Sequence, residues 1–219
     1  MGSLFRPRHE LVFVYKTAKD KHSNNLKLGK HGRSRTNVWA YAGATSFSDT
    51  RDEDLAQVKD ATDLPINLEM AVTDEMIAIG ERFKPHAACF VPEKREERTT
   101  EGGLTVAGLH NQVAPAVARM RDAGSRVSLF IEPDPVQIAV AEVLGAPVVE
   151  LHTGKYAELW LAGDKAGIEE EVAKLKLAAS EAVKRGIEPH AGHGLTYDNV
   201  GPIAAIPELA ELNIGHFLI

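Results

Sequence analysis

The sequence has few aromatic residues, one cysteine and no long apolar run. Cys89 has no partner for an intrachain disulfide, and it lies in an apolar stretch where we expect a buried, unreactive thiol. No apolar run approaches the roughly 20 residues that a membrane-spanning helix needs. The first eight residues also lack the apolar centre of a signal peptide. These absences predict a soluble, cytoplasmic protein without a membrane partner.

The charge is distributed unevenly between two parts of the chain. Residues 1–50 carry nine Lys or Arg against three Asp or Glu, a balance of +6, so the rest of the chain sums to -12 to give the net -6. A basic segment can contact nucleic acid or phosphate, or it can have a separate origin. It lacks interleaved aromatic residues and any known nucleic-acid-binding module, so we expect no nucleic-acid partner. We therefore divide the chain into an atypical basic segment, 1–50, and a domain, 51–219.

Residues 1–50 give weak structural signals. Residues 11–15 and 37–41 could each form a strand, whereas residues 16–35 are polar and lack the apolar period of a helix. We expect a loop between the two strands.

From residue 52 the pattern alternates between strands and helices. Gly124, Gly145 and Gly186 each follow a helical pattern and precede an apolar strand, which is typical of a helix that ends in a left-handed residue. This repeat favours an α/β fold. It favours a (β/α)8 TIM-type barrel over the alternative, a doubly wound sheet. The expected strands are residues 66–71, 86–91, 126–131, 148–152, 188–191 and 212–219, and the expected helices are residues 52–59, 73–79, 106–123, 134–144, 166–185 and 197–210.

The stretch from Pro189 to Tyr197 ends a strand with two imidazoles and two glycines. We expect Gly192 and Gly194 to let a ligand approach the backbone, and Thr196 or Asp198 to cap the next helix. His193 could give or take a proton there, because imidazole titrates near neutral pH. The structural alternative is a turn histidine without chemistry.

Reactive side chains of such a barrel belong at the carboxyl ends of its strands. Glu69 and Glu150 lie in apolar strands, where an acid is costly unless it is paired, so both are candidates for function. Four histidines could be metal ligands, but none has the spacing that makes a metal site specific, so no metal is expected. They are His152, His190, His193 and His216.

Six motifs follow one another along the chain, among them Glu150-Leu-His-Thr-Gly154 and Ala191-Gly-His-Gly-Leu-Thr-Tyr197. In this order they resemble the motifs of the pyridoxine 5′-phosphate synthase family. The resemblance implies a (β/α)8 barrel that condenses 1-deoxy-D-xylulose 5-phosphate with 3-amino-2-oxopropyl phosphate in vitamin B6 biosynthesis, a transferase-type ring closure. The motifs lie at residues 67–73, 91–95 with 99–103, 127–131, 150–154, 191–197 and 211–216.

The resemblance also implies roles for individual residues. Glu69 would accept a proton, His193 would donate one, and Glu150 would stabilise charged intermediates. Thr99 would bind the xylulose phosphate, and three residues would hold the aminoketone phosphate: Gly194, Gly215 and His216. We expect small phosphorylated substrates, no cofactor, and a homo-oligomer.

The resemblance runs from Arg51 to Ile219 and departs at both ends. The family's first strand ends in Asn-x-Asp-His and its second in His-x-Arg, and neither motif occurs here; Ala42 stands near the expected position of a catalytic histidine. The closing helix of the barrel is also missing after Ile219. We therefore expect a barrel incomplete at both ends. The alternative function is a non-catalytic relative or fragment that lacks the first- and second-strand active-site residues.

Overall fold

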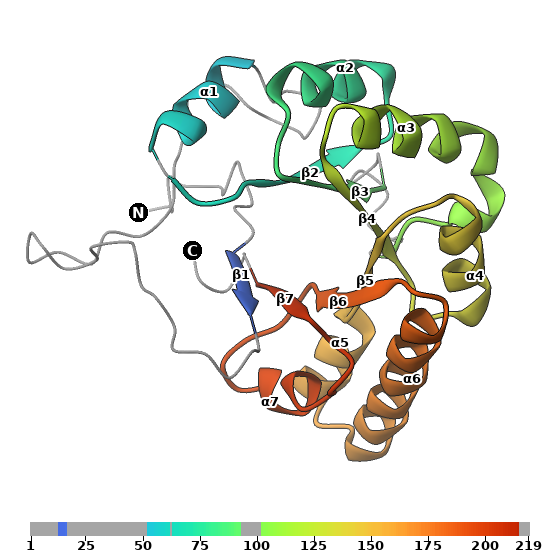
Figure 1. Ribbon diagram of the computed structural model, residues 1–219. Coiled ribbons are helices and arrows are strands. Elements are labelled where there is room, and N and C mark those ends of the chain that lie inside the picture. Colours follow the sequence, from blue (N-terminus) through green and yellow to red (C-terminus); the bar gives the residue numbers. More distant parts are fainter. Residues whose placement is uncertain (1–12, 17–51, 62, 93–101, 215–219) are drawn as a thin grey trace, which may run out of the picture.

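The structure is a computed structural model that describes residues 13–16, 52–61, 63–92 and 102–214. Strands and helices alternate through most of this part of the chain (Figure 1). In chain order the elements are β1 (Phe13–Lys16), α1 (Asp52–Ala61), β2 (Asn67–Ala71), α2 (Asp74–Phe83), β3 (Ala87–Val91), the 3-10 helix η2 (Val106–Gly108), α3 (His110–Asp122), β4 (Arg126–Ile131), α4 (Pro135–Val143), β5 (Val148–His152), α5 (Gly154–Ala162), α6 (Lys165–Lys184), β6 (Glu188–Gly192), α7 (Val200–Ala204) and β7 (Glu211–Ile214).

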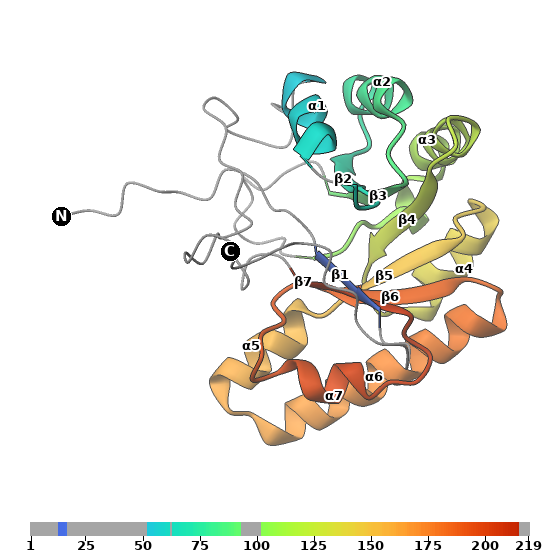
Figure 2. The same cartoon turned by 60° about the vertical axis from the view of Figure 1, so that its left-hand side comes forward.

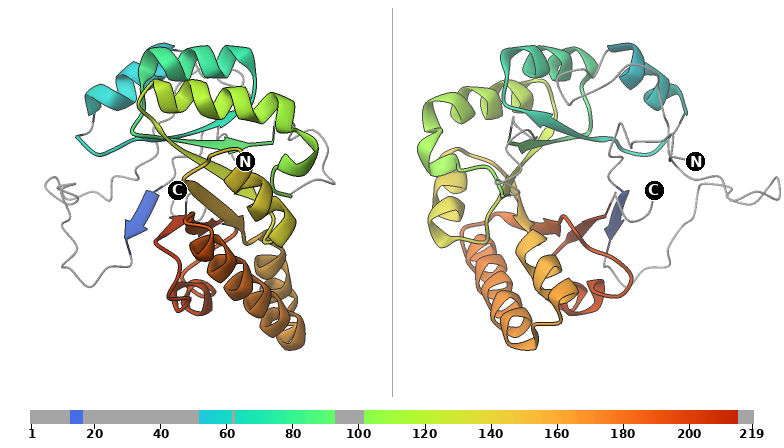
Figure 3. Two further views of the ribbon diagram at one scale, coloured as in Figure 1. Left: turned by 45° about the vertical axis from the view of Figure 1, so that its right-hand side comes forward. Right: turned by 180° about the vertical axis from the view of Figure 1, so that it is seen from behind.

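Six strands form a parallel sheet in which each strand pairs with the next one in sequence, from β2 to β7. β1 pairs antiparallel with β7, so that Phe13 lies opposite Ile214 (Figure 2). The sheet curls, and the helices lie around its outer side (Figures 1 and 3). This arrangement confirms the predicted α/β class, with the parallel strands forming part of a (β/α)8 barrel.

The two faces of the strands differ in chemistry, as the period of two along a strand requires. The face toward the helices is apolar and contributes to the core, whereas the inner face carries polar side chains. Residues of the apolar face include Leu68, Met70, Ala88, Phe90, Val127, Leu129, Ile131, Val149, Leu151, Ala191 and Leu212. Residues of the inner face include Glu69, Cys89, Ser128, Glu150, His190 and Asn213.

Local signals in the sequence account for several element boundaries. Thr73 caps α2, because its hydroxyl accepts a hydrogen bond from the Met76 N–H at 3.2 Å. Gly124, Gly145 and Gly186 follow helices with φ of 95°, 72° and 73°, which confirms the predicted left-handed helix ends.

Two helix predictions were wrong in detail. Two helices, α5 and α6, occupy the region where only residues 166–185 were expected to be helical, and α7 is much shorter than the expected residues 197–210. Pro115 lies inside α3, which begins at His110 and continues past it. The proline is exposed, so its ring lies on the solvent side of the helix.

Some predictions fall outside the described residues. These include the strand at 37–41, the loop at 16–35 except Lys16, and the substrate-binding candidates Thr99, Gly215 and His216. Within the described ranges, no helix has both the length and the apolar character needed to cross a membrane.

Candidate active site on the inner face of the sheet

Glu150 lies at the middle of β5 and its side chain points to the inner face of the sheet. The residue is 3% exposed. The Asn213 amide on β7 donates a hydrogen bond to Glu150 Oε2, and the Cys89 thiol on β3 lies 3.5 Å from the same oxygen. A buried carboxylate is costly unless donors surround it. Asn213 and Cys89 supply such donors from two other strands.

Glu69 reaches the same region from β2. Its backbone lies beside that of Cys89 in the parallel register. The Cys89 thiol interacts electrostatically with both Glu69 and Glu150. Burial, and then the negative charges of Glu150 and Glu69, raise the pKa of Cys89 well above its ordinary value. The thiol therefore stays protonated and can donate to Glu150. This agrees with the expectation of a buried, unreactive cysteine.

Gly192 makes room for Glu150. A Cβ at this position would collide with Glu150 Oε1 and would lie 2.9 Å from the backbone oxygen of Asn213. The prediction that this glycine exposes the backbone to a ligand was wrong, because the chain's own carboxylate takes the space.

His193 follows β6 at the carboxyl end of the sheet. Its φ is 82°, which is rare for a residue with a side chain, and the φ of Gly194 is 75°. The Thr153 hydroxyl lies 2.6 Å from the carbonyl oxygens of both Gly192 and His193, so it can donate to either. Such backbone strain costs on the order of 1–3 kcal/mol and persists only where neighbouring groups hold it.

Asn199 organises the turn after His193. Its side-chain oxygen accepts from the Thr196 N–H at 2.7 Å, and its amide donates to the Gly194 carbonyl at 3.1 Å. The Tyr156 hydroxyl of α5 donates to the Asn199 carbonyl at 2.6 Å. The predicted caps, Thr196 and Asp198, are therefore wrong: α7 begins after Asn199, which makes no side-chain cap bond.

A second imidazole stands beside His193. The rings of His152 and His193 have centroids 4.9 Å apart, and Phe130 packs edge-on against His152 at 5.0 Å. His152 Nδ1 lies 2.8 Å from Glu132 Oε1, which also accepts the Gly103 N–H at 2.8 Å. The hydrogen bond from His152 is the main cause that lowers the pKa of Glu132, and burial opposes it.

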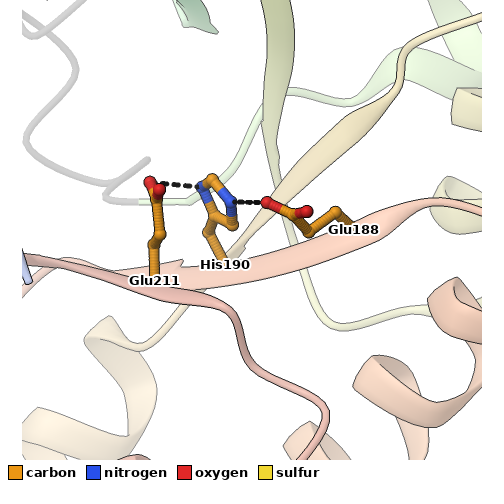
Figure 4. Close-up of side chains that lie close together, drawn as sticks. All are labelled: Glu188, His190 and Glu211. Atoms are coloured by element: carbon orange, nitrogen blue, oxygen red, sulfur yellow. Dashed lines mark hydrogen bonds and ion pairs between the residues drawn. The ribbon is translucent and has the colours of Figure 1, made fainter. Parts of the chain in front are cut away.

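A chain of charged groups lies near the amino end of the sheet, away from His193. His190 Nε2 lies 2.9 Å from Glu188 Oε1, and its Nδ1 lies 3.5 Å from Glu211 Oε2 (Figure 4). Arg126 Nη1 also lies 2.9 Å from Glu188 Oε1. The Glu188, His190 and Glu211 ligand atoms are close enough to hold a metal ion. However, Arg126 already supplies positive charge to Glu188, and His190 lies within hydrogen-bond distance of it, so the arrangement is explained as a network of polar and ionic contacts.

This network predicts an acid-sensitive contribution to stability. The hydrogen bond from Arg126, followed by that from His190, lowers the pKa of Glu188 from 4.5 to about 2. Because the folded pKa lies below the unfolded one, the stabilisation is complete above about pH 4.5 and is lost as the pH falls toward 2. We expect Glu188→Gln to lower stability at pH 6 and to flatten its fall in this window. Glu188 is more than a third exposed, so the effect should stay near the ~1 kcal/mol of surface ion pairs.

Urea unfolding from pH 6 to pH 2 measures this effect. Glu158→Gln is the matched control, because Glu158 is exposed and its ion pair with Lys155 is long, at 4.0 Å between Lys155 Nζ and Glu158 Oε2. A Glu188→Gln profile that is parallel to the wild-type profile over the whole range would contradict the prediction.

Comparison with known proteins places the chain in a family. Residues 48–219 match the family described as pyridoxal phosphate biosynthesis protein PdxJ. The chain belongs to the PdxJ family. It is 58% identical over 168 residues to the pyridoxine 5′-phosphate synthase of Rhodospirillum rubrum. The aligned region covers 77% of this chain and 66% of the relative. The corresponding enzyme of Jannaschia sp. is 56% identical over 169 residues, covering 77% and 68%.

The match to the PdxJ family covers only part of this chain and only part of its relatives. A relative from Caulobacter vibrioides is 52% identical over 189 residues, which covers 81% of this chain and 74% of the relative. The chain thus spans about two thirds of the length of the PdxJ relatives first matched. Residues 1–47 lie outside the PdxJ family match.

Within this PdxJ chain, the structure describes four of the seven predicted site residues. Glu69 and Glu150 lie on either side of Cys89, and His193 and Gly194 lie in the turn after β6. Sequence reasoning gave no role to Thr153 and Asn213, which help to hold this region together, and it considered His152 only as a metal ligand. The available signal was the alternation of each strand, since Asn213 lies two residues after Glu211 and therefore on the same inner face.

Proposed function

We propose that this chain is a pyridoxine 5′-phosphate synthase. It would condense 1-deoxy-D-xylulose 5-phosphate with 3-amino-2-oxopropyl phosphate, closing the pyridine ring with loss of water and phosphate. The observation that carries the proposal is the 52–58% identity to relatives with this name, over a region that contains Glu69, Glu150 and His193.

The chemistry of ring closure requires groups of these types. An amine attacks a carbonyl, protons are removed beside carbonyl or imine carbons, and eliminations follow. In our proposal Glu69 accepts a proton, His193 donates one, and Glu150 stabilises positive charge in the intermediates. The buried position of Glu150 supports this role, because a fixed charge acts more strongly where water is excluded.

Phosphate binding is assigned to the strand ends. Thr99 would contact the xylulose phosphate, and Gly194, Gly215 and His216 would hold the aminoketone phosphate. Small phosphorylated substrates are the partners that we propose, without a nucleic acid. We also propose that the protein is a homo-oligomer and that it is cytoplasmic. Light scattering of the purified chain tests the oligomeric state.

The direct test is formation of the ring product from the two phosphate substrates by the intact chain. The second candidate function is a non-catalytic relative or fragment, which the identity to relatives named as synthases does not favour. Product formation by the chain separates the two functions.

The departure of residues 1–50 from the family leads to a prediction about rate. We expect weak turnover by the chain as given, because a third base and several phosphate contacts of the family have no counterpart there. Misplaced substrates alone can cost on the order of 100-fold in rate. A version whose first 50 residues carry the family's Asn, Asp, His and Arg motifs should therefore turn over at least about 100-fold faster.

The control for this exchange is the same version with the introduced histidine and arginine changed to alanine. Full activity of the chain as given would contradict the prediction. Absence of any gain, with a closing helix also added after Ile219, would favour the non-catalytic function.

A further inference from the structure

His152 is a buried histidine whose two ring nitrogens have different surroundings. Nδ1 lies 2.8 Å from Glu132 Oε1, whereas Nε2 is buried without a hydrogen-bond partner in the part of the chain that the structure describes. The side chain is 5% exposed. An unsatisfied buried polar atom costs on the order of 1–3 kcal/mol, so a purely structural ring at this place would be better as phenylalanine. Packing alone therefore does not explain why an imidazole occupies this position.

Glu132 fixes the state of this imidazole. Its carboxylate has a lowered pKa and is ionised near neutral pH, so it can only accept hydrogen bonds. Nδ1 of His152 must therefore carry the proton between them. Because Oε1 also accepts the Gly103 N–H at 2.8 Å, the carboxylate itself is held in place from the other side.

The opposite edge of the His152 ring lies against Gly154 and His193. A Cβ on Gly154 would collide with His152 Nε2 and would lie 3.2 Å from His193 Cδ2. The glycine at the start of α5 thus permits the two rings to pack at a centroid distance of 4.9 Å and an angle of 57°. Phe130 packs against both rings, at 5.0 Å and 6.1 Å.

His193 depends on such neighbours, because its backbone is strained. Thr153 restrains the backbone carbonyl groups of Gly192 and His193. The rings of His152 and Phe130 lie against the His193 imidazole, and His152 is itself oriented by the Glu132 carboxylate.

We propose that the Glu132–His152 pair is a positioning device for His193, in which Glu132 orients His152 and the ring of His152 fixes the ring of His193. The inference rests on the proposed synthase function, in which His193 donates a proton. His152 and Glu132 then act through His193. Partners of this indirect kind are commonly worth 10- to 100-fold in activity around metal-bound histidines, and we expect a similar scale here.

A double-mutant cycle separates positioning from general packing. We expect His152→Phe, which keeps the ring, and Glu132→Gln, which keeps the shape, to lower kcat by about 10- to 100-fold with KM changed by less than about twofold. In a His193→Asn background the same substitutions should cost less than about twofold more, since the residue on which they act is gone. His110→Phe, at an exposed site on α3, is the matched control.

A second readout is independent of turnover. In protein with isotope-labelled histidine, we expect the imidazole NMR signals of His193 to shift in His152→Phe and Glu132→Gln and to stay unchanged in His110→Phe. If the intact chain forms no product but these shifts occur, the proposed function fails and the positioning of His193 stands. Unchanged His193 signals in both variants, or losses of kcat that are additive with His193→Asn, would overturn the inference.

Discussion

Replacing Glu69 by Gln, or His193 by Asn, is expected to lower turnover by on the order of 100- to 10,000-fold each. Glu69→Gln keeps the size of the side chain, His193→Asn leaves a smaller polar side chain, and each removes the group that exchanges a proton. Since neither changes the phosphate-binding candidates, the loss should appear in kcat more than in KM.

The measurement is steady-state turnover beside that of Glu158→Gln, an exposed carboxylate that should behave as wild type. If the intact chain turns over too slowly, the comparison moves to the version with the family-like N-terminus. Wild-type kcat in Glu69→Gln or in His193→Asn would remove that residue from the mechanism.

Gly192→Ala is expected to damage both stability and turnover. The added methyl group would collide with the Glu150 carboxylate, and the Asn213 backbone oxygen 2.9 Å away leaves it no other space. Glu150 would have to move, which breaks its bonds from Asn213 and Cys89. We expect a loss of about 1–3 kcal/mol in the free energy of unfolding from overpacking, and a fall in kcat of about 100-fold from the displaced charge.

Gly201→Ala is the control for this substitution. Gly201 lies in α7, where an added Cβ meets nothing within 4 Å, so alanine there should be neutral or slightly stabilising. Urea unfolding and turnover of the two variants test the difference. Equal results for Gly192→Ala and Gly201→Ala would show that Glu150 tolerates the methyl group.

The parallel part of the fold could be predicted from the sequence because its signals are local. Several strands are short runs rich in apolar residues, such as β3 and β4, and Gly124, Gly145 and Gly186 mark where three helices end. The helix α5 was missed because its apolar pattern is irregular. Leu161 is 87% exposed, and Gly163, with φ of 68°, separates this helix from α6 by only a short turn.

The candidate site was predictable only in part. An acid in an apolar strand predicts a special role, which is why Glu69 and Glu150 could be named from the sequence. The partners of these acids depend on register between strands, and no local pattern records that Asn213 and Cys89 meet Glu150. For the same reason, the glycine at 192 indicates that space is needed but not which group fills it.

The antiparallel pairing of β1 with β7 affects the order in which the sheet can be assembled. Each parallel pair joins successive strands, so these contacts can form one after another as the chain leaves the ribosome. β1 precedes the other described strands in the sequence, yet its partner in the sheet is the last of them, β7. Its pairing closes almost the whole sequence into one loop, and that closure carries the largest entropic cost of any strand pair here. Among the described strands, the earliest to be synthesised is thus the last to gain a place in the sheet.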